Sequence, residues 1–404
     1  MTTIVEQIAA HVSRPLSESD RGRARFHLVD WLACVAGGRR SPVAAAVRGL
    51  SDPIERAALL GNVMEMDDVH RVARLHPGPV VWPAALMAGA ATPGALAEAA
   101  IAGYEAMIAL GETLDDRHYA HWHPTATAGM FGAAAAAARA IGLDEGRTAD
   151  ALGHAASLAG GLWHMRHGDS MTKQVHVLHA ATAGVHSARL AAAGLTGAIG
   201  SVEGEQGLYA AMTDRPEALR LSDGWKMAEV SFKPWAACRH AHPAIDAALE
   251  LGRAEGPILV ATYRDALTFC DRPDPATASE ARFSIQHAVA VAMTHGKVLP
   301  EHFEPAAIAA LAAERARVSV REDADFSARY PAHFGARISA EGRSVERIDT
   351  LGDPERPLDE AAINAKLATL CAWGGLPADA PAEAERAIDS GPAALIALLD
   401  GWTR

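Results

Sequence analysis

The sequence predicts a mainly helical protein with two parts. A large all-helical domain is formed by both chain ends, residues 1–225 and 358–404, and a smaller α+β lid domain covers residues 226–357. A chain of 404 residues exceeds the size at which a single hydrophobic core stops growing, so two domains are expected. Ala-rich helical patterns fill the first part, and short β-prone runs appear only after WKMAEV.

The first part reads as successive helices with Gly or Pro at the joints. Ile4, Val5, Ile8 and Val12 recur at helical spacing. The following helical segments are LAEAAIAGYEAMIALGETL, FGAAAAAARAIGL, EGRTADALGHAASLAGGLW and HAATAGVHSARLAAAGL. The longest weakly polar run, residues 128–143, is too short and too rich in Ala and Gly to predict a membrane span.

The second part alternates β-prone and helical patterns. The β-prone runs are EVSFKPW, ILVATYRDALTFC and ARISAEGRSVERIDTL, and the helical runs are HPAIDAALELGRA and SEARFSIQHAVAVAMTHG. This alternation predicts an α+β unit that ends near GDPERPLDE. The helical pattern then returns, so we expect residues 358–404 to pack back onto the first domain.

Composition and charge restrict the partners and the compartment. With 37 basic and 49 acidic residues the formal net charge is -12, which disfavours nucleic acid and anionic membranes as partners but not a small anionic substrate. The cysteines Cys34, Cys238, Cys270 and Cys371 show no C-x-x-C spacing, so neither a zinc knuckle nor a disulfide framework is predicted. The N-terminus lacks a signal peptide pattern, and a cytoplasmic location is expected.

The stretch MEMDDVHRVARLHPGPVVWPAA is the densest group of chemical side chains. It holds seven ionisable residues between Glu65 and His76, followed by an apolar, proline-rich run. His76 precedes a rigid segment that leads into a helix, with Pro83 near its first turn. Taken alone, His76 is as well explained by a hydrogen bond to a backbone carbonyl, and Asp67 or Asp68 by capping of a loop.

A second group of histidines lies in HYAHWHPTATAGMFG. The spacing of His118, His121 and His123 is a weak signal for a metal site, and core packing remains an alternative for the first two. Pro124 forces an extended or turn conformation on His123, just ahead of a predicted helix. A histidine in that place suits anion binding or acid/base catalysis.

Two basic groups complete the candidate residues, one in each predicted domain. The first lies in GGLWHMRHGDSMTKQVHVLH and includes Arg166, His167, Lys173 and His176. The second opens the smaller domain in SFKPWAACRHAHPAID and includes Lys233, Cys238, Arg239, His240 and His242. A solvated lysine is the ordinary alternative. One basic group per domain predicts a cleft between the domains.

These motifs, in this order, resemble the MmgE/PrpD family. The series runs MDDVH, LHPG with PAAL, HPTATAGMFG, MTKQVH, EGEQGLYAAM, FKPWAAC with a following histidine, and EARFSIQHAVA, over roughly residues 55–295. The family includes 2-methylcitrate dehydratase, cis-aconitate decarboxylase and an iminodisuccinate epimerase. The resemblance implies an all-helical domain built from both chain ends, a smaller lid domain, a homodimer, and an active site between the domains that needs no cofactor.

The resemblance also implies roles for individual residues. The family's histidine before proline falls on His76, the histidine before the small-residue helix on His123, and its two lysines on Lys173 and Lys233. The acidic patch falls on Glu65, Asp67 and Asp68. We predict catalytic roles for His76, His123, Lys173 and Asp68. Substrate contacts are predicted for Glu65, Asp67, Arg74, Arg166, Lys233, Cys238, His242 and His287.

Three positions depart from the family pattern. Glu65 stands where many members have Asp, Val69 where they have Thr, and His287 in FSIQH where a tyrosine is common. The chain is also shorter than typical members. Because these positions are expected near the substrate, the resemblance leaves the substrate and the reaction open.

The reactions of the family share one chemical demand, which explains the residue types. Each removes a group or a proton next to a carboxylate, through a transition state with extra negative charge. Lys173, Lys233 and Arg74 or Arg166 would stabilise that charge. A histidine, with an unperturbed pKa of about 6.5, is a suitable base, and His76 and His123 are the candidates for base and acid in either order. The carboxylates would orient them.

Three hypotheses follow from the sequence. The first is a lyase of the dehydratase type that acts on a small di- or tricarboxylate without cofactor or metal. The second is an epimerase, isomerase or decarboxylase of a similar acid. The third, suggested by 19 histidines, is a histidine-rich metal-binding protein, which metal analysis of the purified protein would distinguish.

Overall fold

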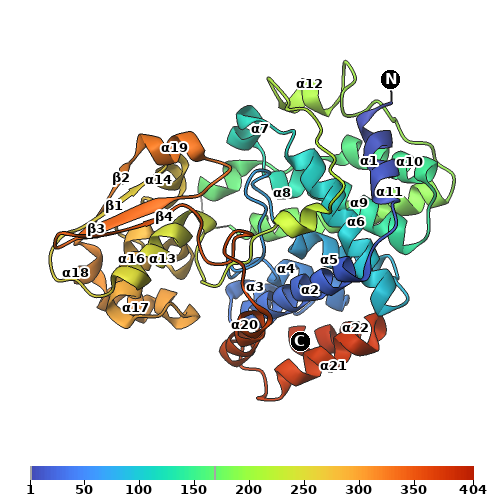
Figure 1. Cartoon of the computed structure of the whole chain (residues 1–404). Coiled ribbons are helices and arrows are strands. Elements are labelled where there is room, and N and C mark those ends of the chain that lie inside the picture. The colour runs from blue at the N-terminus through green and yellow to red at the C-terminus, as the bar shows by residue number, and fades with distance from the viewer. Residues whose placement is uncertain (1, 168–169) are drawn as a thin grey trace. The chain divides into compact units, whose positions relative to one another are not determined.

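The computed structural model describes residues 2–167 and 170–404, which divide into two compact units (Figure 1). The first unit contains the chain up to Val63, Asp67–Val230 and Glu360–Arg404. The second contains Ser231–Asp359 and the short segment Met64–Met66. The sequence predicted the α+β part at residues 226–357, and the packing of three residues of the acidic stretch with this unit was not predicted.

The named secondary-structure elements of the first unit are all helices among its described residues, and the prediction of a mainly helical protein is confirmed. Its N-terminal helices are α1 (Ile4–Val12), α2 (Glu18–Gly38), α3 (Pro42–Val47), α4 (Pro53–Leu60), α5 (Gly78–Met87) and α6 (Pro93–Gly111). Next come α7 (Asp116–His121), α8 (Pro124–Thr127), α9 (Gly129–Ala140), α10 (Glu145–Leu158), the 3-10 helix η1 (Trp163–His167) and α11 (Thr172–Ala192). The remaining ones are α12 (Leu208–Met212), η2 (Lys226–Glu229), α20 (Glu360–Trp373), α21 (Ala380–Ser390) and α22 (Pro392–Thr403).

Many of these helices start at residues that favour a helix N-terminus. Capping boxes at Thr3 and Ser17 open α1 and α2, because each hydroxyl accepts the N–H of the acidic residue three positions on, whose carboxylate bonds back to the cap. Pro53 and Pro93 stand in the first turns of α4 and α6, where a missing N–H costs nothing.

Small residues let the central helices of the first unit approach closely. A Cβ atom on Gly103 of α6 would lie 2.8 Å from the carbonyl oxygen of Gly132 on α9, so glycine is required at this crossing. The alanines of α9 are buried between α6, α10 and α11. The C-terminal helix α20 packs against α2, as the red and blue helices of Figure 1 show.

Within the described residues, α6 is the helix whose length and composition would let it cross a membrane. The longest weakly polar run named from the sequence is residues 128–143, and α6, which contains Glu98 and Glu105, lies outside that run. In the structure 78% of the apolar segment of α6 is buried. Its contacts with α9 and α2 are those of a core helix.

The second unit contains, among its described residues, a four-stranded sheet in the order β2-β1-β3-β4. The strands are β1 (Ile258–Thr262), β2 (Val318–Glu322), β3 (Ala336–Ala340) and β4 (Arg343–Arg347). β1 pairs in parallel with β2 and antiparallel with β3, and β3 and β4 form a hairpin. The hairpin turns at Glu341 and Gly342, which both have positive φ, as a tight two-residue turn requires.

Helices cover this sheet and complete the second unit. They are η3 (Arg239–Ala241), α13 (His242–Leu251), α14 (Arg264–Cys270), α15 (Ala278–Arg282), α16 (Ile285–His295), η4 (Pro300–Phe303), α17 (Pro305–Ala310), α18 (Ala312–Arg315) and α19 (Ala324–Arg329). α13 packs on β3 and β4, and α16 packs on α13 and β2.

Two β-prone runs behave differently from the prediction, and one strand was missed. EVSFKPW contributes no strand to the described sheet, because Pro234 lacks a donor and the Phe232 N–H bonds to the carbonyl of Gly352 instead. Only the ILVAT half of the second run is a strand, and the remainder forms α14. Val318–Glu322 is a strand that the sequence analysis did not single out.

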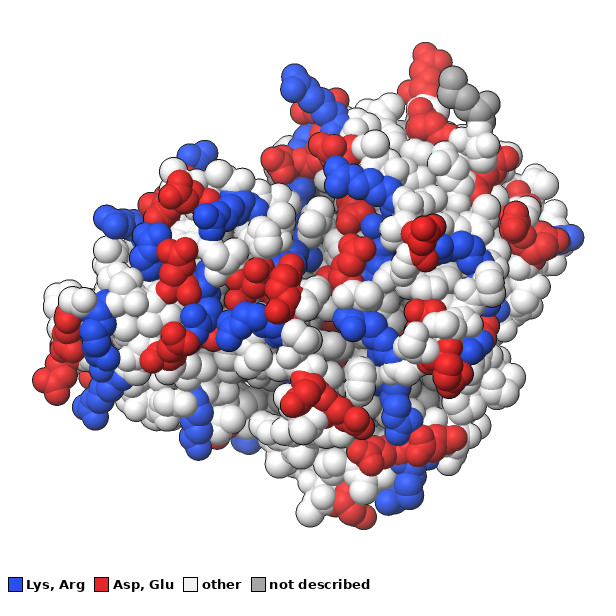
Figure 2. All heavy atoms as spheres, in the orientation of Figure 1, with Lys and Arg blue, Asp and Glu red and all other residues white. Residues whose placement is uncertain are grey.

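The charged surface mixes both signs. On the face shown in Figure 2, basic and acidic side chains are interspersed over the surface.

Candidate active site

Asp68 is buried and anchors the acidic loop to the core of the first unit. Its carboxylate accepts hydrogen bonds from Tyr104 Oη at 2.6 Å, from His27 Nδ1 at 2.8 Å and from the Gly78 N–H at 2.9 Å. Burial lowers the pKa of His27, so the ring is neutral and donates its Nδ1 proton. These contacts are those of a positioning residue; the catalytic role of Asp68 stays a prediction.

Gly78 of the HPG motif lets this anchor form. A Cβ atom at position 78 would lie 2.7 Å from Asp68 Oδ1 and 3.1 Å from Tyr104 Oη. The carboxylate thereby reaches a backbone N–H in the first turn of α5. The glycine of the motif is therefore explained by the close approach of the Asp68 carboxylate to the Gly78 backbone.

Asp67 faces the candidate catalytic histidine. Its Oδ2 accepts a hydrogen bond from Asn62 Nδ2 at 2.6 Å and lies 2.8 Å from His76 Nδ1, although this second contact is poorly aligned for a hydrogen bond. The His76 N–H donates to Thr125 Oγ1 at 3.1 Å. The His76 side chain is 14% exposed and Asp67 is 1% exposed, so the imidazole contacts a buried carboxylate and is itself partly open to solvent.

His123 lies at the start of α8 and contacts a second histidine. Its N–H donates to the carbonyl of Gly161 at 2.8 Å, and its Nδ1 lies 3.3 Å from Nδ1 of His176 on α11. Burial, followed by the charges of Lys173, His176 and His76, lowers the pKa of His123 well below its usual value. His123 is therefore neutral at pH 7, and Lys173 and His76 are both within electrostatic reach of it.

A cavity of about 590 Å³ adjoins this group in the first unit, a size typical of small-molecule sites. His176 connects the two, because it lines the cavity and contacts His123. The other lining residues are Ala126, Gly161, Leu162, His164, Met165, His167, Ser170, Thr172 and His179.

A buried ion pair joins α2 to the C-terminal helix α20. Lys366 Nζ lies 2.5 Å from Asp30 Oδ1, and both side chains are buried. Burial raises the pKa of Asp30 to about 7, the Lys366 ammonium opposes this change, and the charges of Asp68 and Asp67 add to it. The electrostatic environment of the acidic loop thus extends to residues far away in the sequence.

Other predicted residues of the first unit have different surroundings. Arg74 donates to Asp116 at 2.8 Å, and its guanidinium carbon lies 4.2 Å from the centre of the Tyr119 ring. Arg166 is exposed on η1, beside Trp163. Substrate contact by either arginine stays a prediction.

The histidine spacing of α7 does not produce a metal site among the described residues. His118 is buried, and its Nε2 lies 3.0 Å from Thr127 Oγ1, while burial lowers its pKa to about 4. His121 is exposed, and His123 contacts His176. The two buried rings, His118 and His123, therefore contact different polar groups.

A different group, His70, Glu112 and Glu229, brings three potential ligand atoms within 4.8 Å of one another. The Ala73 N–H donates to His70 Nδ1 at 3.1 Å, so Nε2 of the neutral ring carries the proton and has no lone pair for a metal. Lys226 Nζ already binds Glu112 at 2.7 Å. This donor set fits a hydrogen-bonded network better than a metal centre.

In the second unit, Glu65 and Lys233 are both buried, and Glu65 adopts the left-handed conformation with φ of 54°. Such a conformation costs a residue other than glycine about 1–3 kcal/mol and is frequent at functional sites. Its carboxylate lies close enough to Cys238 to affect that thiol's titration. A hydrogen bond from Cys270 lowers the pKa of Cys238, and burial raises the pKa of Cys270 well above its usual range.

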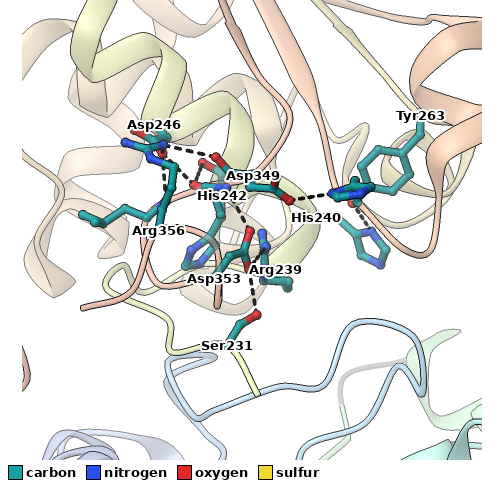
Figure 3. Close-up of polar contacts among 12 residues, drawn as sticks. Ser231, Arg239, His240, His242, Asp246, Tyr263, Asp349, Asp353 and Arg356 are labelled. Carbon is teal, nitrogen blue, oxygen red and sulfur yellow. Dashed lines mark hydrogen bonds and ion pairs between the residues drawn. The ribbon is translucent and has the colours of Figure 1, made fainter. Parts of the chain in front are cut away.

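The predicted histidines of the second unit are also buried. His287 Nε2 lies 2.8 Å from the carbonyl of His302, and burial lowers the pKa of His287 to about 4. His242 Nε2 lies 3.0 Å from the carbonyl of Ala237 (His242 is labelled in Figure 3). Substrate contact by these residues, and by Cys238, stays a prediction.

The MmgE/PrpD N-terminal domain matches residues 56–220, and the MmgE/PrpD C-terminal domain matches residues 235–390. The chain therefore belongs to the MmgE/PrpD family. The family resemblance read from the motifs is confirmed.

Two relatives carry related names. Cis-aconitate decarboxylase of Homo sapiens is 30% identical over 199 residues, which are 45% of this chain and 41% of that protein. The match thus spans less than half of the human protein. Cis-aconitate decarboxylase-like protein oryM of Aspergillus oryzae is 24% identical over 345 residues, 71% of each chain.

Sequence reasoning missed several residues that build the site. Asn62, His27 and Tyr104 hold the two aspartates, but the last two are 41 and 36 residues from Asp68, and no local pattern links them. His176 was already a member of the basic group in the sequence, and it follows Lys173 by three positions on the same face of α11.

Proposed function

We propose that the protein is a lyase of the dehydratase type that acts on a small di- or tricarboxylate by proton transfer next to a carboxylate, without a cofactor. The observation that carries this proposal is the pairing of Asp67 with the partly exposed His76, within the group that also contains His123 and Lys173. Family membership and the names of the relatives support carboxylate chemistry.

His76 is the proposed proton-transfer residue. Asp67 on its Nδ1 side orients the ring and compensates the positive charge that develops when the other nitrogen takes a proton. The ammonium of Lys173 would stabilise the extra negative charge that the substrate carboxylate gains in the transition state.

His123 has a different role in this proposal. Because its pKa lies well below the usual histidine value, it is a weak base and stays neutral at pH 7. A neutral imidazole can still hold a substrate oxygen by a hydrogen bond, as a neutral donor at a charged site. This assigns the two histidines to unequal tasks, which the sequence alone left open.

Further parts of the proposal come from the family resemblance. They are substrate contact by Lys233, a homodimer, and a cytoplasmic location. Analytical ultracentrifugation tests the dimer, which should have twice the mass of the 42.3 kDa chain.

Decarboxylation is the second candidate function, because both relatives named above are called cis-aconitate decarboxylase or decarboxylase-like. The same residues would serve it, since loss of carbon dioxide also leaves extra negative charge next to the remaining carboxylates, and a proton must then be delivered. The third candidate, an epimerase, needs the proton transfer but no leaving group.

Proton NMR in heavy water tests the proposal. The purified protein is incubated with citrate-like, aconitate-like and aspartate-like acids, together with His76→Ala, Lys173→Ala and the control His186→Ala, an exposed histidine on the same helix as Lys173. We expect conversion or deuterium incorporation that both site variants lose and the control keeps. The product distinguishes dehydration, decarboxylation and epimerisation.

A result without turnover or exchange for any acid in the wild-type protein would contradict the proposal. Activity that persists unchanged in His76→Ala would contradict the role of that residue. Stoichiometric bound metal in purified protein, with no turnover of any acid, would instead favour the metal-binding hypothesis.

A further inference from the structure

Arg239 is a buried arginine at the start of the second unit, and only part of its guanidinium is used. It is 4% exposed, and its Nη2 donates to Asp353 Oδ1 at 2.6 Å (Figure 3). The same carboxylate accepts hydrogen bonds from Ser231 Oγ at 2.7 Å and from the Thr350 N–H at 2.8 Å. Asp353 therefore fixes one nitrogen of Arg239 and is itself held in place.

The other two nitrogens of this guanidinium have no partner within residues 2–167 and 170–404. They are Nε and Nη1, which together carry three N–H groups. The ring of Phe334 lies 5.1 Å from the guanidinium carbon and cannot satisfy these donors fully. A buried donor without a partner costs about 1–3 kcal/mol of stability. An arginine that only paired with Asp353 would therefore destabilise the folded protein.

His242, three residues further on, offers the complementary group. Its Nε2 donates to the carbonyl of Ala237 at 3.0 Å, so Nδ1 of the neutral ring is an acceptor. Nδ1 is buried and has no partner in the described part of the chain. Burial lowers the pKa of His242 well below its usual value, and the charges of Arg239 and Lys233 act in the same direction, which places both cations close to the ring.

The backbone adds a second feature that favours an anion here. His242 begins α13, a helix of ten residues, and the preceding Ala241 provides no side-chain cap among the residues described. The positive end of this helix is thus next to Arg239 and Lys233. Unpaired N–H donors, a second cation and a helix N-terminus all favour negative charge at one place.

We propose that Arg239 binds a carboxylate of the ligand, that Asp353 positions it, and that the adjacent His242 Nδ1 accepts a hydrogen bond from a ligand hydroxyl. The ligand class is a small hydroxylated polycarboxylate. This inference rests on the proposed function, because it takes the ligand to be the carboxylate substrate of that reaction.

Titration calorimetry with citrate and tricarballylate tests the inference, since the two acids share three carboxylates and differ in the hydroxyl. The key variant is Arg239→Lys, because the lysine ammonium can keep the ion pair with Asp353 but lacks the donors at Nε and Nη1. Arg356→Lys is the matched control, an arginine of the same unit that pairs with Asp246. Arg239→Gln, whose amide can also donate to Asp353, serves as a second variant.

We expect Arg239→Lys and Arg239→Gln to weaken both acids roughly tenfold or more, and the control to change neither more than about twofold. His242→Ala should weaken citrate by roughly tenfold and tricarballylate by less than about threefold. Thermal melts establish which variants are folded. Equal affinity of a folded Arg239→Lys or Arg239→Gln and the wild type, or no binding of either acid by the wild type, overturns the role of Arg239. Equal weakening of both acids by His242→Ala overturns the role of His242.

The failure of this inference differs from the failure of the proposed function. Citrate binding that depends on Arg239, without conversion or deuterium exchange of any acid, would leave the inference standing and remove the reaction. Conversion and binding that both persist in Arg239→Lys would leave the reaction standing and remove the inference.

Discussion

Two consecutive aspartates each lie 2.8 Å from a histidine Nδ1, and the two pairs differ in the exposure of the histidine and in the other partners of the carboxylate. In the Asp68–His27 pair both side chains are buried, and two further donors, Tyr104 and the Gly78 N–H, fill the carboxylate. In the Asp67–His76 pair the histidine is 14% exposed, and one amide, Asn62, supports the carboxylate.

An Asp–His contact therefore has no fixed role. Burial keeps His27 neutral, so its pair with Asp68 is a hydrogen bond that holds the loop against α5. His76 keeps part of its ring open to solvent, which a proton-transfer residue requires. The first pair therefore supports the second, and changes to each should separate stability from activity.

The largest expected effect is on catalysis. His76→Ala should reduce turnover by roughly 10²- to 10⁴-fold, because it removes the proposed proton-transfer residue, while the free energy of unfolding changes little. Turnover is measured with the acid found in the NMR panel, and unfolding by urea titration. A variant that loses stability and keeps its turnover would reverse the assignment of the two pairs.

The next effect separates the two carboxylates by stability. Asp68→Asn should lower the free energy of unfolding by about 1.5–3 kcal/mol, because the amide group cannot accept from all the donors that face Asp68. Asp67→Asn should cost less than half as much, since the oxygen of the asparagine amide can still accept the hydrogen bond from Asn62. Urea titrations at pH 7 compare them, and equal losses would contradict the comparison.

A smaller effect is expected at the glycine beside the buried pair. In Gly78→Ala the new Cβ would lie 2.7 Å from Asp68 Oδ1, so the anchor must shift at a cost of about 1–3 kcal/mol. Gly22→Ala is the control, because a Cβ on this exposed helical glycine of α2 meets nothing within 4 Å. The control should gain about 0.5–1 kcal/mol in the same urea titration. A neutral Gly78→Ala would show that the anchor is not tightly packed.

The sequence predicted some levels of this structure better than others. The helical first unit followed from apolar periodicity and from caps such as Thr3 and Ser17, which are local signals. The parallel pairing of β1 with β2 joins Ile258 to Val318, and no local pattern encodes a contact over that separation. The packing of Met64–Met66 with the second unit is non-local in the same way.

In the candidate site, too, local motifs were predicted and non-local contacts were not. His76, His123 and Lys173 were candidates from their sequence motifs alone. In the structure, Lys173 and His76 lie close enough to His123 to lower its pKa. The sequence predicted a single acidic patch that includes Asp67 and Asp68. Their separate surroundings depend on His27 and Tyr104, which helices α2 and α6 bring from elsewhere in the chain.

The smallest effect concerns the pH dependence of stability, to which several buried histidines contribute. The pKa of His27 is lowered by burial, and those of His118 and His287 are lowered to about 4. In the unfolded chain these histidines take up protons near pH 6.5, whereas the folded protein resists protonation until lower pH. Stability is therefore fully present above about pH 6.5 and falls progressively as the pH decreases toward 4. Asp30, with its raised pKa of about 7, acts in the opposite sense but is a single group.

Thermal melts between pH 7.5 and 4.5 measure this slope, and His27→Gln and His76→Gln sharpen the comparison. Glutamine does not titrate, so His27→Gln should be less stable at pH 7 but should lose a smaller part of its melting temperature on acidification. His76→Gln is the paired variant at the partly exposed position. Equal slopes for the wild type and His27→Gln would mean that His27 takes up a proton as readily in the folded protein as in the unfolded chain. The Asp68–His27 contact would then become an ion pair on acidification.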